Sequence, residues 1–115
     1  MSGTDSKKKA LDIASKALEK KADNIVILDM RKAAAFCDYF VIASAGSLTK
    51  TRAVTDHIID SLKKTKPYHV EGKTDGQWIL IDYTDVVVHV FYEETRNFYG
   101  LERLWGDAER IEVSE

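Results

Sequence analysis

The stretch from residue 76 to residue 92 constrains the fold most. Apolar and aromatic residues dominate it, and the polar pair Thr84-Asp85 interrupts it. β-branched and aromatic runs on either side of a short polar pair are typical of a β-hairpin. The sequence therefore predicts two strands, at residues 77–83 and 86–92, joined by a two-residue turn.

The two faces of this hairpin differ, because successive side chains of a strand point to opposite sides. A turn at Thr84-Asp85 places three largely aliphatic pairs on one face: Tyr83 with Val86, Ile81 with Val88, and Ile79 with Val90. The other face then carries Asp82 with Val87, Leu80 with His89, and Trp78 with Phe91. The first face suits a core covered by helices. The second face, with its rings, acid and imidazole, predicts a surface that contacts a partner.

The rest of the chain predicts two helices, three further strands and two short C-terminal helical turns. We expect strands at 24–30, 38–45 and 68–71, and helical turns at 94–99 and 101–104. The first helix has Thr4 or Asp5 as its cap, and the second runs from a cap at Ser47 to about Lys64, before Pro67. Apolar residues recur at helical spacing in both helices. The predicted fold is a single α/β domain with a mixed sheet and helices mainly on one face, with loose ends at 1–8 and 107–115.

Length, charge and cysteine content narrow the class of protein. A chain of 115 residues can form one domain with its own hydrophobic core. Its net charge of −2 gives no global basic field, so we expect little direct nucleic-acid contact. The single cysteine, Cys37, excludes an internal disulfide and fits a reducing compartment.

No stretch approaches the roughly 20 apolar residues of a membrane span, and residues 1–9 lack the apolar core of a secretory signal. We therefore expect a cytoplasmic protein.

Five segments carry motifs that stand in a fixed order along the chain. They are 22–29 (ADNIVILD), 38–44 (DYFVIAS), 82–91 (DYTDVVVHVF), 94–99 (ETRNFY) and 101–105 (LERLW). Together they resemble the ribosomal silencing factor, or Iojap, family, from Leu11 to about Asp107. The resemblance implies an α/β fold related to that of nucleotidyltransferases. The sequence departs from the family pattern after Ser47, where Leu48-Thr49-Lys50 replaces what is more often an acidic residue, an arginine and a glutamine.

The sequence contains only part of the set of residues needed for nucleotide transfer. Nucleotidyltransferases hold the triphosphate with a Gly-Ser pair and bind two Mg²⁺ ions through an Asp-x-Asp pair. Gly46-Ser47 matches the first element, but it is also an ordinary helix-capping sequence. The second element is missing: Val87 occupies the next same-face position after Asp85, and a strand would direct Asp82 and Asp85 to opposite faces. We expect no catalytic residue, no cofactor and no metal site.

The resemblance implies a non-enzymatic translational repressor. It implies binding to a large-subunit ribosomal protein, the fourteenth of that subunit, on the face toward the small subunit. Occupying that space would block subunit joining and requires no turnover. An assembly factor for the large subunit and a nucleotide-binding relic of a transferase remain as alternatives. An exposed aromatic patch would also let two copies pair as a homodimer when the protein is free.

Carried over to this sequence, the partner contact is expected on the hairpin and the C-terminal segment. The seven expected contact residues are Trp78, Asp82, His89, Phe91, Tyr99, Leu104 and Trp105. Large rigid rings suit interface cores because they bury area at little entropic cost. Glu102 and Arg103 are candidates for a charged rim around them.

Alternatives stay open at several of these positions. His89 is either a satisfied histidine within the sheet or an exposed contact residue, and we favour the contact. Trp105 either contacts the partner or packs the C-terminal turn onto the sheet. One of the adjacent Phe98 and Tyr99 is expected to face the core and the other the surface. The pattern does not decide which of Tyr39 and Phe40 faces the helices.

Overall fold

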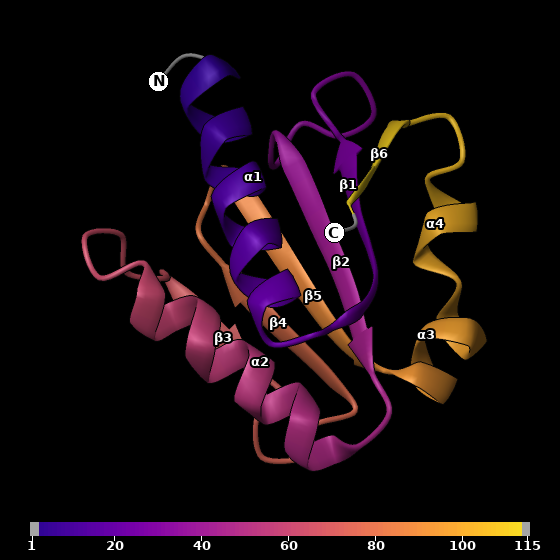
Figure 1. Ribbon diagram of the computed structural model, residues 1–115. Helices are drawn as coiled ribbons and strands as arrows, with labels where there is room; N and C mark the ends of the chain where they lie inside the picture. The colour runs from indigo at the N-terminus through magenta and orange to yellow at the C-terminus, as the bar shows by residue number, and fades with distance from the viewer. Residues whose placement is uncertain (1–2, 114–115) are drawn as a thin grey trace.

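A six-stranded mixed β-sheet forms the centre of the protein (Figure 1). The computed structural model describes residues 3–113. The strands are β1 (Asp23–Asp29), β2 (Tyr39–Ala45), β3 (His69–Glu71), β4 (Trp78–Asp82), β5 (Val86–Tyr92) and β6 (Glu109–Val113). The helices are α1 (Gly3–Glu19), α2 (Leu48–Ser61), α3 (Glu93–Tyr99) and α4 (Leu101–Leu104). The predicted α/β class with a mixed sheet is confirmed.

The strands lie in the order β3-β4-β5-β2-β1-β6. β2 and β5 run parallel at the centre, and the other neighbouring strands pair antiparallel. Parallel neighbours need a crossover connection. Here the chain leaves β2 through α2 and then forms β3 and β4 before it enters β5 (Figure 1).

The register of the β4–β5 hairpin is the predicted one. Trp78 lies opposite Phe91, Leu80 opposite His89, and Asp82 opposite Val87. Thr84 has a φ of 77°, which a β-branched residue rarely adopts. Its N–H donates to the Asp82 carboxylate at 2.7 Å, which helps to hold the turn in this conformation.

The aliphatic face of the sheet is covered by α1 and α2, as predicted. Both helices lie across the same side of the sheet (Figure 1). The predicted inner stripes are Ala10, Ile13, Ala14, Ala17 and Leu18 in the first helix, and Thr51, Val54, Thr55, Ile58 and Leu62 in the second. All of these side chains are buried except Leu18 and Leu62, which are partly buried against the same core. Beneath them Ile79, Ile81, Val88 and Val90 are fully buried. This burial of apolar surface is the main contribution to stability.

The second face of the sheet is partly covered as well. Its buried apolar side chains are Val26, Leu28, Met30, Cys37, Phe40, Ile42, Val87 and Phe91. Leu101 and Trp105, from α4 and its C-terminal end, pack against this cluster. The long helices therefore lie on one face, while the short C-terminal helices cover part of the other.

The predicted loose N-terminus is wrong for residues 3–8. Helix α1 begins at Gly3, so the predicted cap positions, Thr4 and Asp5, lie inside its first turn. Ser6 donates a hydrogen bond to Asp38, and Lys9 pairs with Asp85 at 2.7 Å. These long-range contacts hold the start of the helix on the sheet.

The predicted loose C-terminus is wrong for residues 109–113. β6 pairs antiparallel with β1, with Ile111 opposite Ile27 and Val113 opposite Ile25. The alternating Ile111 and Val113 side chains are half-buried against the core that lies beneath α1 and α2. Residues 1, 2, 114 and 115 lie outside the described part of the chain.

Candidate functional site

Eight aromatic side chains form a continuous row across the second face of the sheet, and we call them the aromatic row. They are Phe36, Phe40, Trp78, His89, Phe91, Phe98, Tyr99 and Trp105. Ring centroids lie 5.1 Å apart for Phe98 and Tyr99, 4.8 Å for Tyr99 and Trp78, 4.9 Å for Trp78 and Phe91, and 5.9 Å for Trp78 and His89. The row continues with 4.6 Å for His89 and Phe40, 6.3 Å for Phe40 and Trp105, and 6.5 Å for Trp105 and Phe36. These spacings fall largely in the range of favourable aromatic pairing.

Exposure changes along the aromatic row. Its two ends are open to solvent, with Phe98 80% and Phe36 62% exposed. Its middle is buried, with Phe40 and His89 each 4% exposed and Phe91 fully covered. The row therefore connects the exposed rings at its ends to the buried core of the second face.

His89 lies in the buried middle, so the expectation that it is an exposed contact residue is wrong. The indole Nε1–H of Trp78 donates to His89 Nδ1 at 3.0 Å, and Phe40 packs against the imidazole. Burial lowers the pKa of His89 from 6.5 to about 4, so the ring is neutral at pH 7. Because Nδ1 accepts a hydrogen bond, we assign the ring proton to Nε2, which is buried without a partner.

Phe91 is also unavailable to a partner, which corrects its assignment as a contact residue. The Trp78 indole lies across it, with a centroid distance of 4.9 Å, and the side chain is 0% exposed. Trp78, Asp82 and Trp105 are half-buried and present part of their surface. Trp105 packs against the buried apolar cluster on the second face. The alternative in which it packs the C-terminal turn onto the sheet therefore applies to part of its side chain.

The C-terminal segment supplies most of the strongly exposed apolar side chains on this side of the protein. Leu104 is 71% exposed and Tyr99 54%. Phe98 and Tyr99 both face outward, so the expectation that one of them enters the core is wrong. The physical reason is that α3 faces the sheet through Arg96, its one buried residue among those described.

Phe36 belongs to the aromatic row and was missed from the sequence. It lies in the connection between β1 and β2, and its ring is 6.1 Å from Phe40 and 6.5 Å from Trp105. Tyr39 and Phe40 are neighbours on β2, so their side chains point to opposite faces of the sheet. Tyr39 faces the core beneath α1 and α2, and Phe40 faces the buried apolar cluster on the second face.

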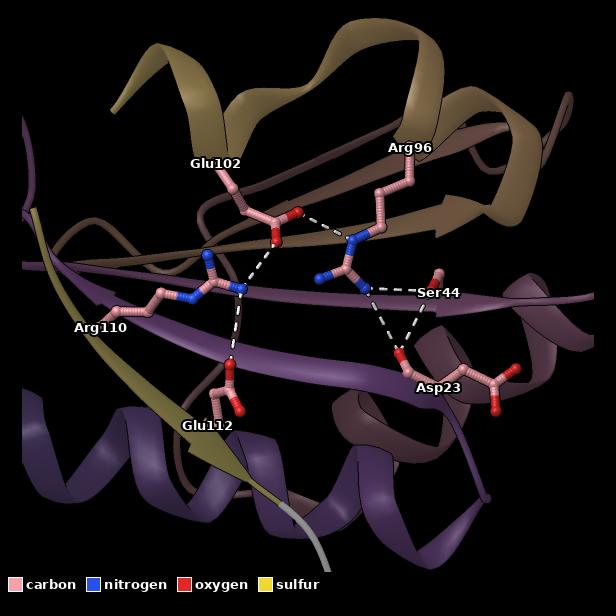
Figure 2. Close-up of polar contacts among 6 residues, drawn as sticks. All are labelled: Asp23, Ser44, Arg96, Glu102, Arg110 and Glu112. Carbon is pink, nitrogen blue, oxygen red and sulfur yellow. Dashed lines mark hydrogen bonds and ion pairs between the residues drawn. The ribbon is translucent and has the colours of Figure 1, made fainter. Parts of the chain in front are cut away.

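A polar network holds α3 and α4 against the sheet (Figure 2). The Arg96 guanidinium, 7% exposed, donates through Nε to Glu102 at 2.9 Å and through one terminal nitrogen to the Ser44 hydroxyl at 3.0 Å. The second carboxylate oxygen of Glu102 accepts from Arg110 of β6 at 3.2 Å.

The residues of this polar network come from five elements, including Asp23 at the start of β1. The segment that carries Phe98, Tyr99, Leu104 and Trp105 is therefore fixed from beneath by charge-assisted hydrogen bonds.

The residues considered for catalysis have other roles here. Ser47 caps α2 by accepting a hydrogen bond from the Lys50 N–H at 3.1 Å, as the capping interpretation of Gly46-Ser47 predicts. Asp82 accepts from the turn, while Asp85 pairs with Lys9 of α1, so the two acids do not share a site. Cys37 is buried, and this burial raises the pKa of its thiol to about 12, so the thiol stays protonated at neutral pH. Within residues 3–113, no three His, Cys, Asp or Glu side chains group closely enough to hold a metal ion.

Comparisons with known proteins agree with the motif resemblance. The family model described as "Ribosomal silencing factor during starvation" matches residues 4–115. The chain belongs to the ribosomal silencing factor family. It is 38% identical over 104 residues to the ribosomal silencing factor of Bacillus subtilis, covering 88% of each chain.

Two further proteins are similar to this chain. The mouse protein named "Mitochondrial assembly of ribosomal large subunit protein 1" is 32% identical over 92 residues, which are 76% of this chain and 40% of the mouse protein. A crystal structure from Chromobacterium violaceum is similar with a TM-score of 0.82 at 26% identity, covering 100% of this chain and 95% of that one. No helix among residues 3–113 is both long and apolar enough to cross a membrane.

Proposed function

We propose that this ribosomal silencing factor homologue binds the large ribosomal subunit through the exposed part of the aromatic row together with Leu104. The bound protein then occupies space that the small subunit needs and prevents the two subunits from joining. The partner is a ribosomal protein on the inter-subunit face, the fourteenth of the large subunit. The action is steric and requires no chemical reaction.

One observation carries the proposal: four strongly exposed apolar side chains lie on the short helices and the β1–β2 connection beside the second face. Phe36, Phe98, Tyr99 and Leu104 are each more than half exposed. Scattered apolar residues are ordinary on a surface, but rings that connect through a buried row are typical of a protein-binding site. The half-buried Trp78 and Trp105 lie between these exposed groups and the core, where they support a rigid contact surface.

The charge of the protein favours a protein partner over RNA. The net charge is −2, and Arg96 and Arg110 near this surface are paired with Glu102. Paired arginines offer little free positive charge to phosphates. A cytoplasmic protein that acts on free subunits is consistent with this chemistry and with the family to which the chain belongs.

Sedimentation with purified ribosomal subunits tests the proposal. The protein is mixed with large subunits, with small subunits, or with neither, and each mixture is centrifuged through a sucrose cushion. We expect the protein in the pellet with large subunits alone. Pelleting with small subunits only, or with neither particle, would contradict the proposal.

A second function, assembly of the large subunit, is favoured by the name of the mouse relative. The same surface would then act on immature particles. Binding to mature large subunits and to precursor particles separates the two functions. Equal or tighter binding to mature particles supports silencing, whereas binding to precursors only supports assembly.

The same surface is available to a second copy of the chain. Large apolar groups exposed on a free protein favour self-association. We therefore propose a homodimer in the absence of ribosomes that competes with large-subunit binding. Sedimentation equilibrium over a range of concentrations measures it, and a monomer at every concentration would exclude it.

A further inference from the structure

The bond between Trp78 and His89 joins two strands through their side chains. Trp78 lies on β4, and His89 lies on β5 as the diagonal neighbour, since Trp78 pairs with Phe91 and Leu80 with His89. The Nε1 to Nδ1 distance of 3.0 Å is that of a good N–H···N hydrogen bond. This bond fixes one edge of an indole whose ring also packs on Tyr99, 4.8 Å away.

The polarity of this bond is fixed by chemistry. An indole nitrogen only donates, so the imidazole must accept at Nδ1 and carry its proton at Nε2. The rings in contact with His89 are Trp78, Phe40 and Phe91, and none of them carries a charge. Its cross-strand neighbours, Leu80 and Ile42, are aliphatic. The surroundings therefore stabilise the neutral imidazole that can accept.

Folding alone does not require an imidazole at this position. The Nε2–H is buried without a partner, and a buried unsatisfied donor is destabilising. An apolar side chain of similar size would avoid that penalty and still fill the space among the rings. What it could not provide is the acceptor that orients the Trp78 indole.

We propose that His89 is a positioning residue for the partner surface. Its Nδ1 fixes the orientation of the Trp78 indole, and the indole in turn supports Tyr99 in the position that meets the large subunit. His89 itself does not touch the partner. This inference rests on the proposed function for its effect on binding, but the orientation of the indole can be measured without a ribosome.

The first experiment uses the unmodified protein labelled with ¹⁵N. A long-range ¹⁵N–¹H correlation spectrum at pH 7 reports which nitrogen of His89 carries the proton. We expect protonation at Nε2 alone and slow solvent exchange of the Trp78 indole proton. Protonation of His89 at Nδ1 would overturn the proposal, because that nitrogen could then not accept from the indole.

The second experiment compares two variants in binding to large subunits. His89→Leu keeps an apolar group of similar size and removes the acceptor, whereas His89→Asn offers an amide oxygen near the position of Nδ1. We expect His89→Leu to bind about fivefold more weakly, the effect of one ordinary hydrogen bond, and His89→Asn to recover most of that loss. Ile42→Val, a buried neighbour on β2, is the packing control and should bind as the unmodified protein does.

The outcomes separate the positioning role from a purely structural one and from failure of the proposed function. Unchanged binding by a folded His89→Leu variant would overturn the inference. If that variant does not fold, the protonation state of the unmodified protein decides. If even the unmodified protein fails to bind large subunits, the proposed function fails. Indole exchange then still tests His89: faster exchange in His89→Leu than in His89→Asn supports it, and equal exchange rates contradict it.

Discussion

Glu102 and Arg96 form an ion pair of 2.9 Å that joins α4 to α3, and the arginine is buried. Removing one partner of such a pair leaves a buried charge without compensation. We predict that Glu102→Gln lowers the free energy of unfolding by about 2 kcal/mol. The loss is smaller than for a fully buried ion pair, because the Glu102 side chain is 21% exposed. Urea unfolding followed by circular dichroism measures the change.

Glu112→Gln is the matched control for that substitution. Glu112 lies 3.8 Å from Arg110 and its side chain is 78% exposed, so it contributes little. We expect its unfolding midpoint to match that of the unmodified protein. If the two variants are equally stable, the network does not hold α3 and α4 in place.

His89 makes stability depend on pH on the acid side of neutrality. Burial lowers its pKa in the folded protein to about 4, whereas in the unfolded chain it is near 6.5. Between these values the unfolded chain binds more protons, so stability falls as the pH falls from about 6.5 to about 4. The full effect is on the order of 3 kcal/mol.

Unfolding of the unmodified protein and of His89→Asn in urea, at a series of pH values, checks this expectation. The variant lacks the imidazole, so the difference in stability between the two proteins should change through that window and level off below it. A constant difference across the window would show that His89 keeps an ordinary pKa in the folded state.

Gly100 forms the joint between α3 and α4 and has a φ of 57°. A Cβ added at Gly100 would lie close to the Arg103 guanidinium, which ends a flexible side chain and can move away. Most of the expected loss of stability therefore comes from the positive φ of the backbone. We predict that Gly100→Ala lowers the free energy of unfolding by about 1 kcal/mol. Gly46→Ala is the control, since a Cβ there meets no atom within 4 Å. Equal losses in the two variants would contradict a special role for the joint.

Leu104 tests the contact surface with little effect on the fold. It is 71% exposed, so Leu104→Ser should leave the thermal midpoint nearly unchanged. If it is a central contact, large-subunit binding weakens by about tenfold or more. Leu11→Ser, on α1 and 43% exposed, removes the same side chain on the helical side of the protein. Equal binding of the two variants would remove Leu104 from the interface.

The hairpin could be predicted in detail because its information is local. The alternation of residues from Trp78 to Phe91 and the short turn fix the register, and the structure has the same pairs. The C-terminal strand was missed although Ile111 and Val113 alternate, because an edge strand depends on a distant partner, β1.

The burial of the second face could not be predicted from the alternating pattern alone. Phe91 and His89 occupy positions that would be open on an isolated hairpin, and they are covered by rings and short helices from other parts of the chain. The burial of Arg96 depends on Ser44 and Glu102, which are separated from it by 52 and 6 residues. Sequence periodicity does not reveal such long-range partners.

The most direct test of steric silencing is a subunit-joining assay. Purified large and small subunits are mixed at a magnesium concentration that permits joining, with and without the protein, and light scattering follows the formation of whole ribosomes. We predict that the unmodified protein and Leu11→Ser suppress joining at the same concentration, while Leu104→Ser needs about tenfold more protein for the same effect. Undiminished joining when large subunits are saturated with the unmodified protein would contradict the account.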